Sequence, residues 1–382
     1  MESQQPRILI AGAGIGGLAL AIALQRNGTT AVIWERAQAL REIGAGLLLT
    51  PNAVWILKRL GLFDQTCRAG MVISRWEILN RSGKVLQTFR QGGDLPSISV
   101  TRSAFQQLLR TGLAPEAVLL DHEIRGLKRA AADASMAVTS AHGVTFAADL
   151  LVGADGGNSA VRAAAVDSRM PRVLGYVGWR GLVDHLPSGW ENGRITESWG
   201  DGGRFGIAPV AGGRTYWYAT ENSPAGWSVP VEKRKAHLLK RFQNWHDPVC
   251  DLIAATNDGD ILLSPISEHR TLRSWHRESV TLLGDAAHLM TPNLGQGAAM
   301  ALEDAWVLAE CLREHGCGGT ALLRYEQLRK HRTSRIVWLS RQIGRLIQIR
   351  HPAITMARDA ALRLTPDWLG AWTLGPVFNF RA

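Results

Sequence analysis

A glycine-rich turn near the N-terminus constrains the fold of this 382-residue chain more than any other feature. The apolar run of residues 7–11 leads into GAGIGG at residues 12–17, and the Ala/Leu-rich residues 18–25 follow with helical spacing. A second apolar run, residues 31–34, ends at Glu35. Because strand, glycines, helix, strand and acidic residue follow in this order, the segment predicts the first βαβ unit of a dinucleotide-binding fold.

The same turn indicates which nucleotides it can bind. Gly12, Gly14 and Gly17 allow a tight turn and a close approach of the backbone to a pyrophosphate. Glu35 lies roughly 20 residues further on, where it can accept a hydrogen bond from a ribose hydroxyl. An acidic residue at that strand end usually rejects a 2′-phosphate, so we expect tightly bound FAD or NAD and not NADP.

A second strand-turn-helix segment lies at residues 281–303. The apolar run of residues 281–284 predicts a buried strand, and an Ala-rich helix begins at Gly297. Asp285 opens the loop of small residues between them. A helix N-terminus beside an acidic residue at a strand end suits a ligand that carries negative charge. Taken alone, this segment could bind any phosphate.

Composition narrows the function classes only slightly. The net charge of +10 is compatible with nucleic acid, an anionic membrane or anionic ligands, but Lys and Arg are scattered without a run of five like charges, which favours an ordinary basic surface. A ligand with a pyrophosphate would account for part of the surplus. The four cysteines show neither CxxC spacing nor a metal-ligand pattern, so we expect free thiols, a reducing, cytoplasmic location and no bound metal. No apolar run outside the first βαβ unit approaches membrane-spanning length, and we expect no integral membrane contact and no nucleic-acid partner.

The middle of the chain differs in composition from both ends. Residues 176–266 are rich in Trp, Tyr and Gly and alternate over short stretches, which predicts an inserted, mainly antiparallel sheet. The helical tail of residues 322–364 is basic and amphipathic; such a helix can bind membranes but more often packs on its own domain or a second subunit. We therefore predict an α/β protein with a dinucleotide-binding domain of residues 1–70, 100–175 and 270–335, an inserted domain of residues 71–99 and 176–269, and a C-terminal helical segment of residues 336–382.

A third motif completes a recognisable set. An apolar strand delivers GADGGNS at residues 153–159, between GAGIGG and GDAAHLMTPNLGQG at residues 284–297. In this order the three motifs resemble the single-component FAD-dependent aromatic hydroxylases, the group typified by p-hydroxybenzoate hydroxylase, over nearly the whole chain. Pro51-Asn52, residues 178–181 and PNLGQG are similar to a branch that includes bacterial urate hydroxylases, alkylquinolone hydroxylases and zeaxanthin epoxidases.

This resemblance implies a Rossmann-like FAD-binding domain with a parallel sheet, a substrate-binding β-sheet domain and C-terminal helices. It implies that NADPH or NADH reduces the FAD, and that O2 then forms a flavin C4a-hydroperoxide that hydroxylates or epoxidises an aromatic or heteroaromatic small molecule. Because no second dinucleotide fingerprint is found, the nicotinamide should visit the flavin transiently. A monomer or homodimer is expected. Two alternatives stay open: a flavin oxidase or dehydrogenase in which the substrate reduces FAD, and a non-catalytic basic binding protein.

The resemblance also assigns residues. At the FAD it places Gly12, Gly14, Gly17, Glu35, Arg36, Arg41, Arg102, Asp155, Asp285, Pro292, Leu294, Gly295 and Gly297. At the reacting flavin ring it places Pro292, Gly295, Gln296 and Gly297. Reduced flavin carries negative charge at its N1–C2 edge, which donors at a helix N-terminus would stabilise.

The inserted sheet supplies the expected substrate residues. These are Trp179, Arg180, Arg204, Tyr216 and Tyr218, with the pocket favoured most for Arg204 and Tyr218. Strand residues alternate between faces, so only some of them can point inward. His288 is predicted to make a structural hydrogen bond, and no residue is identified as a general base.

Overall fold

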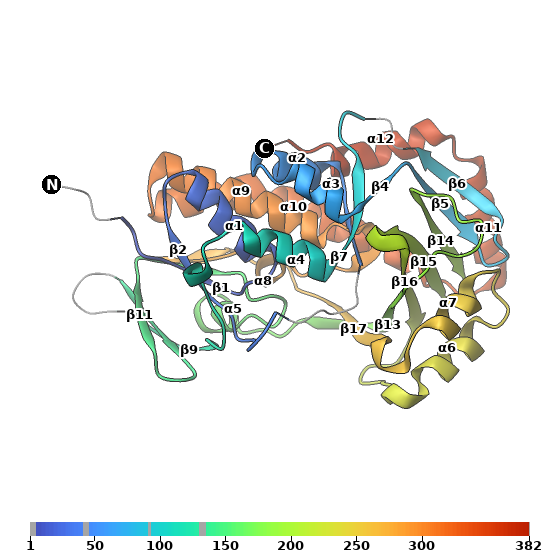
Figure 1. Cartoon of the computed structure of the whole chain (residues 1–382), viewed down its shortest axis with the longest axis horizontal. Coiled ribbons are helices and arrows are strands. Elements are labelled where there is room, and N and C mark those ends of the chain that lie inside the picture. Colours follow the sequence, from blue (N-terminus) through green and yellow to red (C-terminus); the bar gives the residue numbers. More distant parts are fainter. Residues whose placement is uncertain (1–4, 41–45, 91–92, 130–134, 382) are drawn as a thin grey trace.

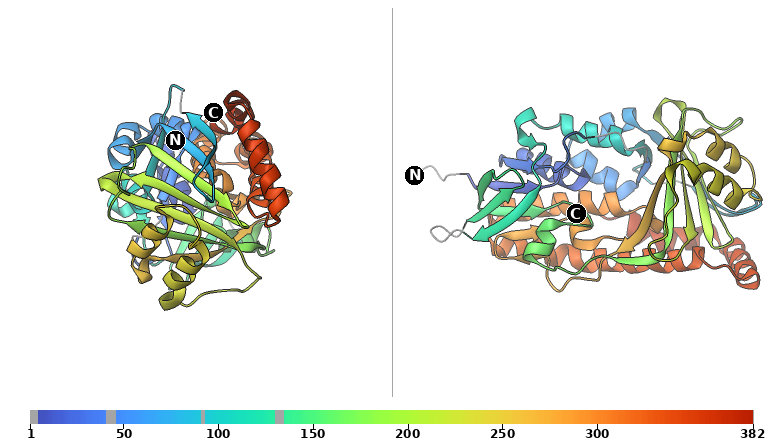
Figure 2. Two further views of the ribbon diagram at one scale, coloured as in Figure 1. Left: turned by 90° about the vertical axis from the view of Figure 1, so that its right-hand side faces the viewer. Right: turned by 90° about the horizontal axis from the view of Figure 1, so that it is seen from below.

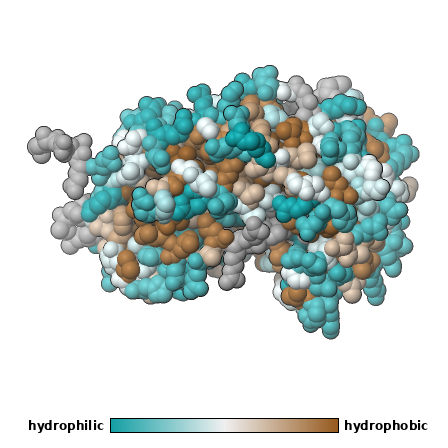
Figure 3. All heavy atoms as spheres, viewed as in Figure 1, coloured by the Kyte–Doolittle hydropathy of each residue, from teal (hydrophilic) through white to brown (hydrophobic). Residues whose placement is uncertain are grey.

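The computed structural model describes residues 5–40, 46–90, 93–129 and 135–381. A parallel sheet with its helices lies at one end, and a second sheet lies at the other (Figure 1). On the face shown in Figure 3, hydrophilic side chains dominate the outer edges and apolar side chains gather toward the middle. None of the described helices combines the length and apolar character that crossing a membrane requires.

The first sheet has six strands in the order β18-β19-β12-β1-β2-β8. All four residues of β1 are buried, with helix α1 (Ile15–Arg26) and strand β11 (Thr145–Ala148) packed against this strand. Its pairings with β12 and β2 are parallel, which confirms the predicted dinucleotide-type sheet. The strands are β1 (Ile8–Ala11), β2 (Ala31–Trp34), β8 (Val118–Leu119), β12 (Leu150–Gly153), β18 (His276–Arg277) and β19 (Val280–Leu282).

The second sheet has seven strands in the order β17-β13-β16-β15-β14-β5-β6. It is antiparallel except where β14 pairs with β5, so the predicted mainly antiparallel sheet is confirmed. Helices α6 (Arg234–Phe242) and α7 (Val249–Ala255) cover one face (Figure 2). The strands are β5 (Arg75–Asn80), β6 (Val85–Arg90), β13 (Arg172–Val183), β14 (Arg194–Gly200), β15 (Gly203–Val210), β16 (Arg214–Asn222) and β17 (Leu262–Glu268).

Within the described parts of the chain there are also two three-stranded sheets, in the orders β11-β10-β9 and β3-β7-β4. Strands β4 (Met71–Ile73) and β5 follow closely in the chain but belong to different sheets. The division lies at Ser74 and Arg75, whose N–H groups both donate to the carbonyl of Gly193. The strands are β3 (Gly46–Leu49), β4 (Met71–Ile73), β7 (Ser97–Thr101), β9 (Ile124–Arg129), β10 (Met136–Ser140) and β11 (Thr145–Ala148).

Long helices at the C-terminal end run beside the parallel sheet and reach the second one (Figures 1 and 2). Helix α9 (Gly297–His315) packs between α1 (Ile15–Arg26) and α10 (Gly319–Ile347). The predicted C-terminal helices are confirmed. The remaining helices are α2 (Pro51–Arg59), α3 (Phe63–Ala69), α4 (Arg102–Thr111), α5 (Ala160–Ala165), α8 (Asp285–His288), α11 (Pro352–Leu364) and α12 (Asp367–Phe378).

Candidate active site

A cavity of about 1030 Å³ lies between the two large sheets. Strands β1, β12 and β19 are parallel neighbours, so their carboxyl ends meet at one edge of the first sheet. The three glycine-containing motifs follow those three strands and all contribute to the cavity wall. Polar side chains of the second sheet form the opposite wall. Ligands of open α/β sheets bind at this edge.

The glycines of the first motif have different roles. Gly12 has φ +101°, and a Cβ there would lie 2.6 Å from the carbonyl oxygen of Ala154. A Cβ at Gly17 would lie 2.1 Å from the carbonyl oxygen of Gly12, and Gly17 does not line the cavity. A Cβ at Gly14 would meet no atom of the described residues within 4 Å, and Gly14 does line the cavity. Gly12 and Gly17 therefore permit the turn, whereas Gly14 leaves space for a ligand.

The carboxylate of Glu35 is held beside this turn. It accepts hydrogen bonds from the N–H groups of Ala13 (2.8 Å) and Ala37 (2.9 Å). Arg36 and Arg102 also line the cavity, Arg102 from the first position of α4. Arg41, which was predicted near the cofactor, lies outside the described residues.

The carboxylate of Asp155 accepts hydrogen bonds mainly from its own turn. Its carboxylate accepts from the hydroxyl of Ser159 and from the N–H groups of Ala160 (2.7 Å) and Val161 (3.2 Å). Burial raises the pKa of Asp155, and these hydrogen bonds oppose the shift. The residue borders the cavity, so one side chain both shapes the second motif and faces the ligand space.

The third motif presents a helix N-terminus to the cavity. Pro292, Leu294, Gly295 and Gly297 line it, and Gly295 has φ +64° with no atom within 4 Å of a Cβ position. A Cβ at Gly297 would approach only the Asp285 Oδ1, at 3.9 Å. The first N–H groups of α9 therefore start beside open space.

Asp285 is the second residue of the same motif and the first residue of α8. Its side chain is accessible to solvent, but within the cavity rather than on the outer surface. The surrounding protein atoms raise its pKa by desolvation, while the charges of His288 and Arg102 act in the opposite direction. A positively charged or hydrogen-bonding ligand group would stabilise this carboxylate.

Gln296 points away from the cavity, although it was predicted at the reacting ring. Its fully buried amide donates to Thr50 Oγ1 (2.8 Å) and accepts from Asn52 Nδ2 (3.0 Å). His288 does not line the cavity either; its Nε2 donates to Asp304 Oδ2 (2.6 Å), the structural hydrogen bond that was predicted.

Strand register assembles a polar row on the cavity face of the second sheet. Arg180, Tyr218, Gly206 and Glu197 are paired in that order across β13, β16, β15 and β14. Because Gly206 has no side chain, the Tyr218 ring lies over it: a Cβ there would be 2.1 Å from the ring. The Tyr218 hydroxyl thereby reaches Glu197 Oε2 at 2.5 Å. Burial, and then the charge of Glu197, raise the pKa of Tyr218 well above its usual value, so it stays a donor.

Glu197 was not predicted, yet it is the centre of this row. It also accepts from Trp199 Nε1 (2.6 Å) and from an Arg204 terminal nitrogen (3.2 Å). Arg204 is 2% exposed and lies over the Tyr218 ring at 5.3 Å, and its Nε has no hydrogen-bond partner among the described residues. One sequence feature could have revealed Glu197: the short connection between β14 and β15 places residue 197 opposite residue 206.

A second, apolar row lies beside the polar one. This second row is displaced from the polar row by two residues along the strands. It consists of Tyr216, Ala208, Ile195 and Trp76, all of which line the cavity. Burial raises the pKa of Tyr216, whose ring stacks on that of Tyr218 with 5.7 Å between centroids. Tyr216 thus belongs to the cavity, as the sequence suggested, but mainly as an apolar surface.

Trp179 is placed differently from what was predicted. The residue borders the cavity, but its fully buried indole lies on the opposite face of the sheet, since it neighbours Arg180 along the strand. There its Nε1 donates to Glu221 (2.8 Å), and it stacks on His237. Its side chain belongs to the core beneath α6 and α7.

A family model described as an FAD-binding domain matches residues 5–340. The chain belongs to this family. It is 38% identical over 362 residues to aurachin C monooxygenase/isomerase of Stigmatella aurantiaca, with 94% of each chain covered. It is 31% identical to 6-hydroxynicotinate 3-monooxygenase of Bordetella bronchiseptica, over 87% of this chain and 90% of the other.

Solved structures agree with the family assignment. Klebsiella pneumoniae HpxO complexed with FAD and uric acid superposes with a TM-score of 0.88 at 28% identity, covering 98% of this chain and 95% of the other. The protein is therefore an FAD-dependent monooxygenase.

The residues around the cavity fit FAD. Gly14 and Gly297 leave open space at two helix N-termini, where anionic groups are stabilised. Glu35, a hydrogen-bond acceptor, stands at the end of β2, where a ribose hydroxyl is expected. The cavity continues from these motifs to the polar row of the second sheet.

Proposed function

We propose that the protein uses NADPH or NADH and O2 to hydroxylate or epoxidise an aromatic or heteroaromatic small molecule. The observation that carries this proposal is that the three cofactor motifs and the polar row line one cavity, so a bound substrate would face the cofactor. FAD, when bound, accepts electrons from the nicotinamide and activates O2. The protein's residues hold and orient the reactants and exclude water, which would compete with oxygen transfer.

The polar row defines the recognition of the substrate. Arg204 borders the cavity, and Glu197 is the carboxylate that pairs with it among the described residues, so its guanidinium would bind a carbonyl or anionic oxygen of the substrate. Arg180, held by Ser264 at 2.9 Å, borders the same space. Glu197 keeps Arg204 and Tyr218 in place rather than acting as a base, because its oxygens already accept four hydrogen bonds.

The apolar row defines the shape of the rest of the substrate. Tyr216, Ala208, Ile195 and Trp76 offer a flat apolar surface next to the polar row. A planar ring with one polar edge and an apolar remainder matches this division. The N-terminus of α9 would stabilise negative charge on the reduced cofactor from the other wall.

The purified protein with FAD bound tests this proposal. A panel of aromatic and heteroaromatic compounds is screened for stimulated NADPH and NADH oxidation, and products are checked by mass spectrometry for one added oxygen atom. Arg204→Met should retain FAD but lose most of the stimulation, whereas Arg335→Met, at an exposed site on α10, should behave as the wild type.

Anaerobic mixing separates the proposal from an oxidase or dehydrogenase. Under the proposed reaction, NADPH or NADH should reduce the flavin and bleach its visible colour, with or without substrate present. Bleaching by substrate alone, with no effect of NADPH or NADH, would contradict the proposed reaction and support direct oxidation of the substrate.

A further inference from the structure

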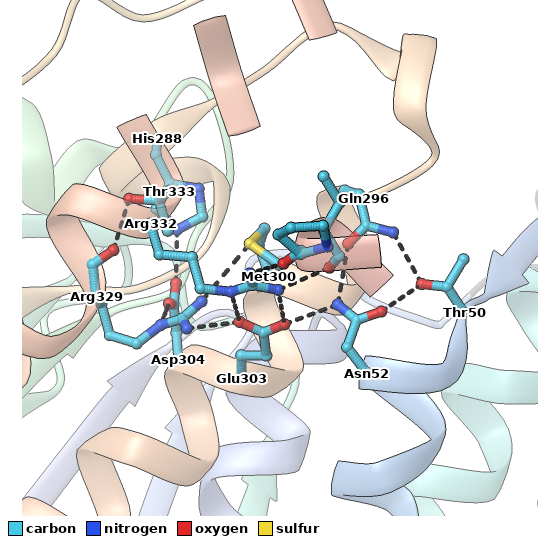
Figure 4. A network of polar contacts seen from close by, with 12 residues as sticks. Thr50, Asn52, His288, Gln296, Met300, Glu303, Asp304, Arg329, Arg332 and Thr333 are labelled. Carbon is cyan, nitrogen blue, oxygen red and sulfur yellow. Dashed lines mark hydrogen bonds and ion pairs between the residues drawn. The ribbon is translucent and has the colours of Figure 1, made fainter. Parts of the chain in front are cut away.

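Two adjacent carboxylates on α9, Glu303 and Asp304, are buried completely beneath the cavity. Buried charges are costly unless they are paired and fully hydrogen-bonded. Figure 4 shows that both carboxylates are paired, with side chains from α2, α8 and α10 converging on them. Arg329 joins the two, donating to Glu303 at 2.5 Å and to Asp304 at 2.7 Å.

Asp304 holds the strand end that precedes Asp285. Its Oδ2 accepts from the Gly284 N–H (3.0 Å) and from His288 Nε2 (2.6 Å). Burial would raise the pKa of Asp304, but His288 and Arg329 outweigh it and lower the pKa to about 2. This carboxylate is thus an ionised anchor for one cavity motif.

Glu303 reaches the other cavity motif through Asn52. Asn52 Nδ2 donates both to Glu303 Oε1 (2.7 Å) and to Gln296 Oε1 (3.0 Å). Gln296 Nε2 donates to Thr50 Oγ1 (2.8 Å), and that hydroxyl donates to Asn52 Oδ1 (2.7 Å). Asn52, Gln296 and Thr50 thus form a closed ring of hydrogen bonds. Because the Glu303 carboxylate can only accept, it fixes which atoms in this ring donate.

Arg332 connects Glu303 to residues 376–380. Arg332 donates to both Glu303 oxygens, at 2.8 Å each. The same guanidinium donates to the carbonyls of Pro376 and Val377, also at 2.8 Å, and Phe380 lies 4.2 Å from its Cζ. A continuous polar path therefore runs from the last turn of α12 to the residue that precedes Gly297.

We propose that Asn52, Glu303 and Arg332 are positioning residues for the FAD-binding turn of residues 295–297, and that residues 376–380 anchor this path from outside. Gln296 has no direct access to the cavity, so it would act through the position of the backbone N–H groups that follow it. The inference depends on FAD as the cofactor and not on the identity of the substrate.

Single variants test the path at its two ends. Asn52→Leu removes the link between Glu303 and Gln296, and Arg332→Met removes the link to Pro376 and Val377. The dissociation constant for FAD and the visible circular dichroism of the bound flavin are measured, with the melting temperature of the FAD-free protein as a separate readout. Both variants should bind FAD about 3- to 30-fold more weakly and change the flavin dichroism.

Matched controls separate positioning from loss of stability. Thr66→Val removes a fully buried hydroxyl in α3, and Arg335→Met removes an exposed arginine of α10 three residues from Arg332. The first should lower the melting temperature without changing FAD affinity or dichroism, and the second should change none of the three. If Asn52→Leu lowers only the melting temperature, as Thr66→Val does, the network merely stabilises the fold and the proposal is wrong.

The double variant tests whether the residues act in series. Once Asn52→Leu has cut the path, removing Arg332 should weaken FAD binding no further, so the double variant should match Asn52→Leu within about twofold. Effects that multiply would overturn the proposal. A chain that ends at Gly375, which lacks both carbonyl acceptors and Phe380, should reproduce the FAD affinity of Arg332→Met, and wild-type affinity would exclude the C-terminal anchor.

Discussion

Gly297 shows how a missing side chain shapes the cofactor end of the cavity. A Cβ there would approach only Asp285 Oδ1, at 3.9 Å, so a larger side chain would extend into the ligand space without disturbing the core. We predict that Gly297→Val raises the dissociation constant for FAD at least about tenfold, or 1.4 kcal/mol, and leaves the FAD-free protein folded. Flavin fluorescence titration measures this, with Gly259→Val, at an open site that does not line the cavity, as control. Normal binding and reduction of FAD would contradict the placement of this turn.

His269 links two of the cavity motifs and carries a pH dependence. Its Nε2 donates to the Gly157 carbonyl (2.8 Å), while its buried Nδ1 has no hydrogen-bond partner among the described residues. Burial, and then the charge of Arg162, lower the pKa of His269 from 6.5 to about 4. The unfolded chain therefore binds a proton between these pH values that the folded protein rejects.

This contribution of His269 to stability is present above pH 6.5 and is lost as the pH falls to about 4. The change amounts to at most about 3.4 kcal/mol, because the pKa falls by about 2.5 and each pKa unit corresponds to about 1.36 kcal/mol. His269→Gln, which keeps a donor for Gly157, should remove that part of the pH dependence. Urea denaturation of both proteins at pH 7, 5.5 and 4 measures it, and parallel stability curves would show that His269 does not titrate in this way.

At the scale of elements, one glycine in β15 determines the polar row. Gly206→Ala would place a Cβ 2.1 Å from the Tyr218 ring and so displace its hydroxyl from Glu197. We predict a loss of stability of about 1–3 kcal/mol and weaker substrate binding, with FAD affinity unchanged. Equilibrium denaturation and binding titrations measure these effects. Gly126→Ala in β9, where a Cβ makes only ordinary contacts at 3.5 Å, is the control.

Strand positions were easier to predict than strand partners. The hairpin of β5 and β6 is an example of a local feature, because its turn at residues 80–83 joins strands that are adjacent in the chain. Glu197 lies in an ordinary alternating strand, and only its pairing with Gly206 reveals its role. Alternation shows that Trp179 and Arg180 lie on opposite faces of the sheet but not which of them faces the cavity, so both were predicted there; the Trp179 side chain packs in the core beneath α6 and α7.

At the scale of the whole molecule, the cavity lies between the two large sheets, so a ligand bound there should affect the stability of both. Since both large sheets contribute to the cavity wall, FAD should stabilise them together. At a free FAD concentration of 100 times its dissociation constant we predict a gain of about 2.7 kcal/mol in a single unfolding transition. Denaturation curves with FAD and with FMN, which lacks the adenosine half, measure it. Two transitions of which only one responds to FAD would show that the ends unfold independently.

The order of strand, glycine turn and helix in the three motifs could be predicted from the sequence, because tight turns and helix starts depend on neighbouring residues. It therefore indicated the fold class, FAD and most of the motif residues that line the cavity. Tertiary structure alone decided the polar row around Glu197 and the path from Arg332 through Glu303 and Asn52 to Gln296. These contacts join residues that are far apart in the chain, and the packing of α9 and α10 and the register of the second sheet bring them together.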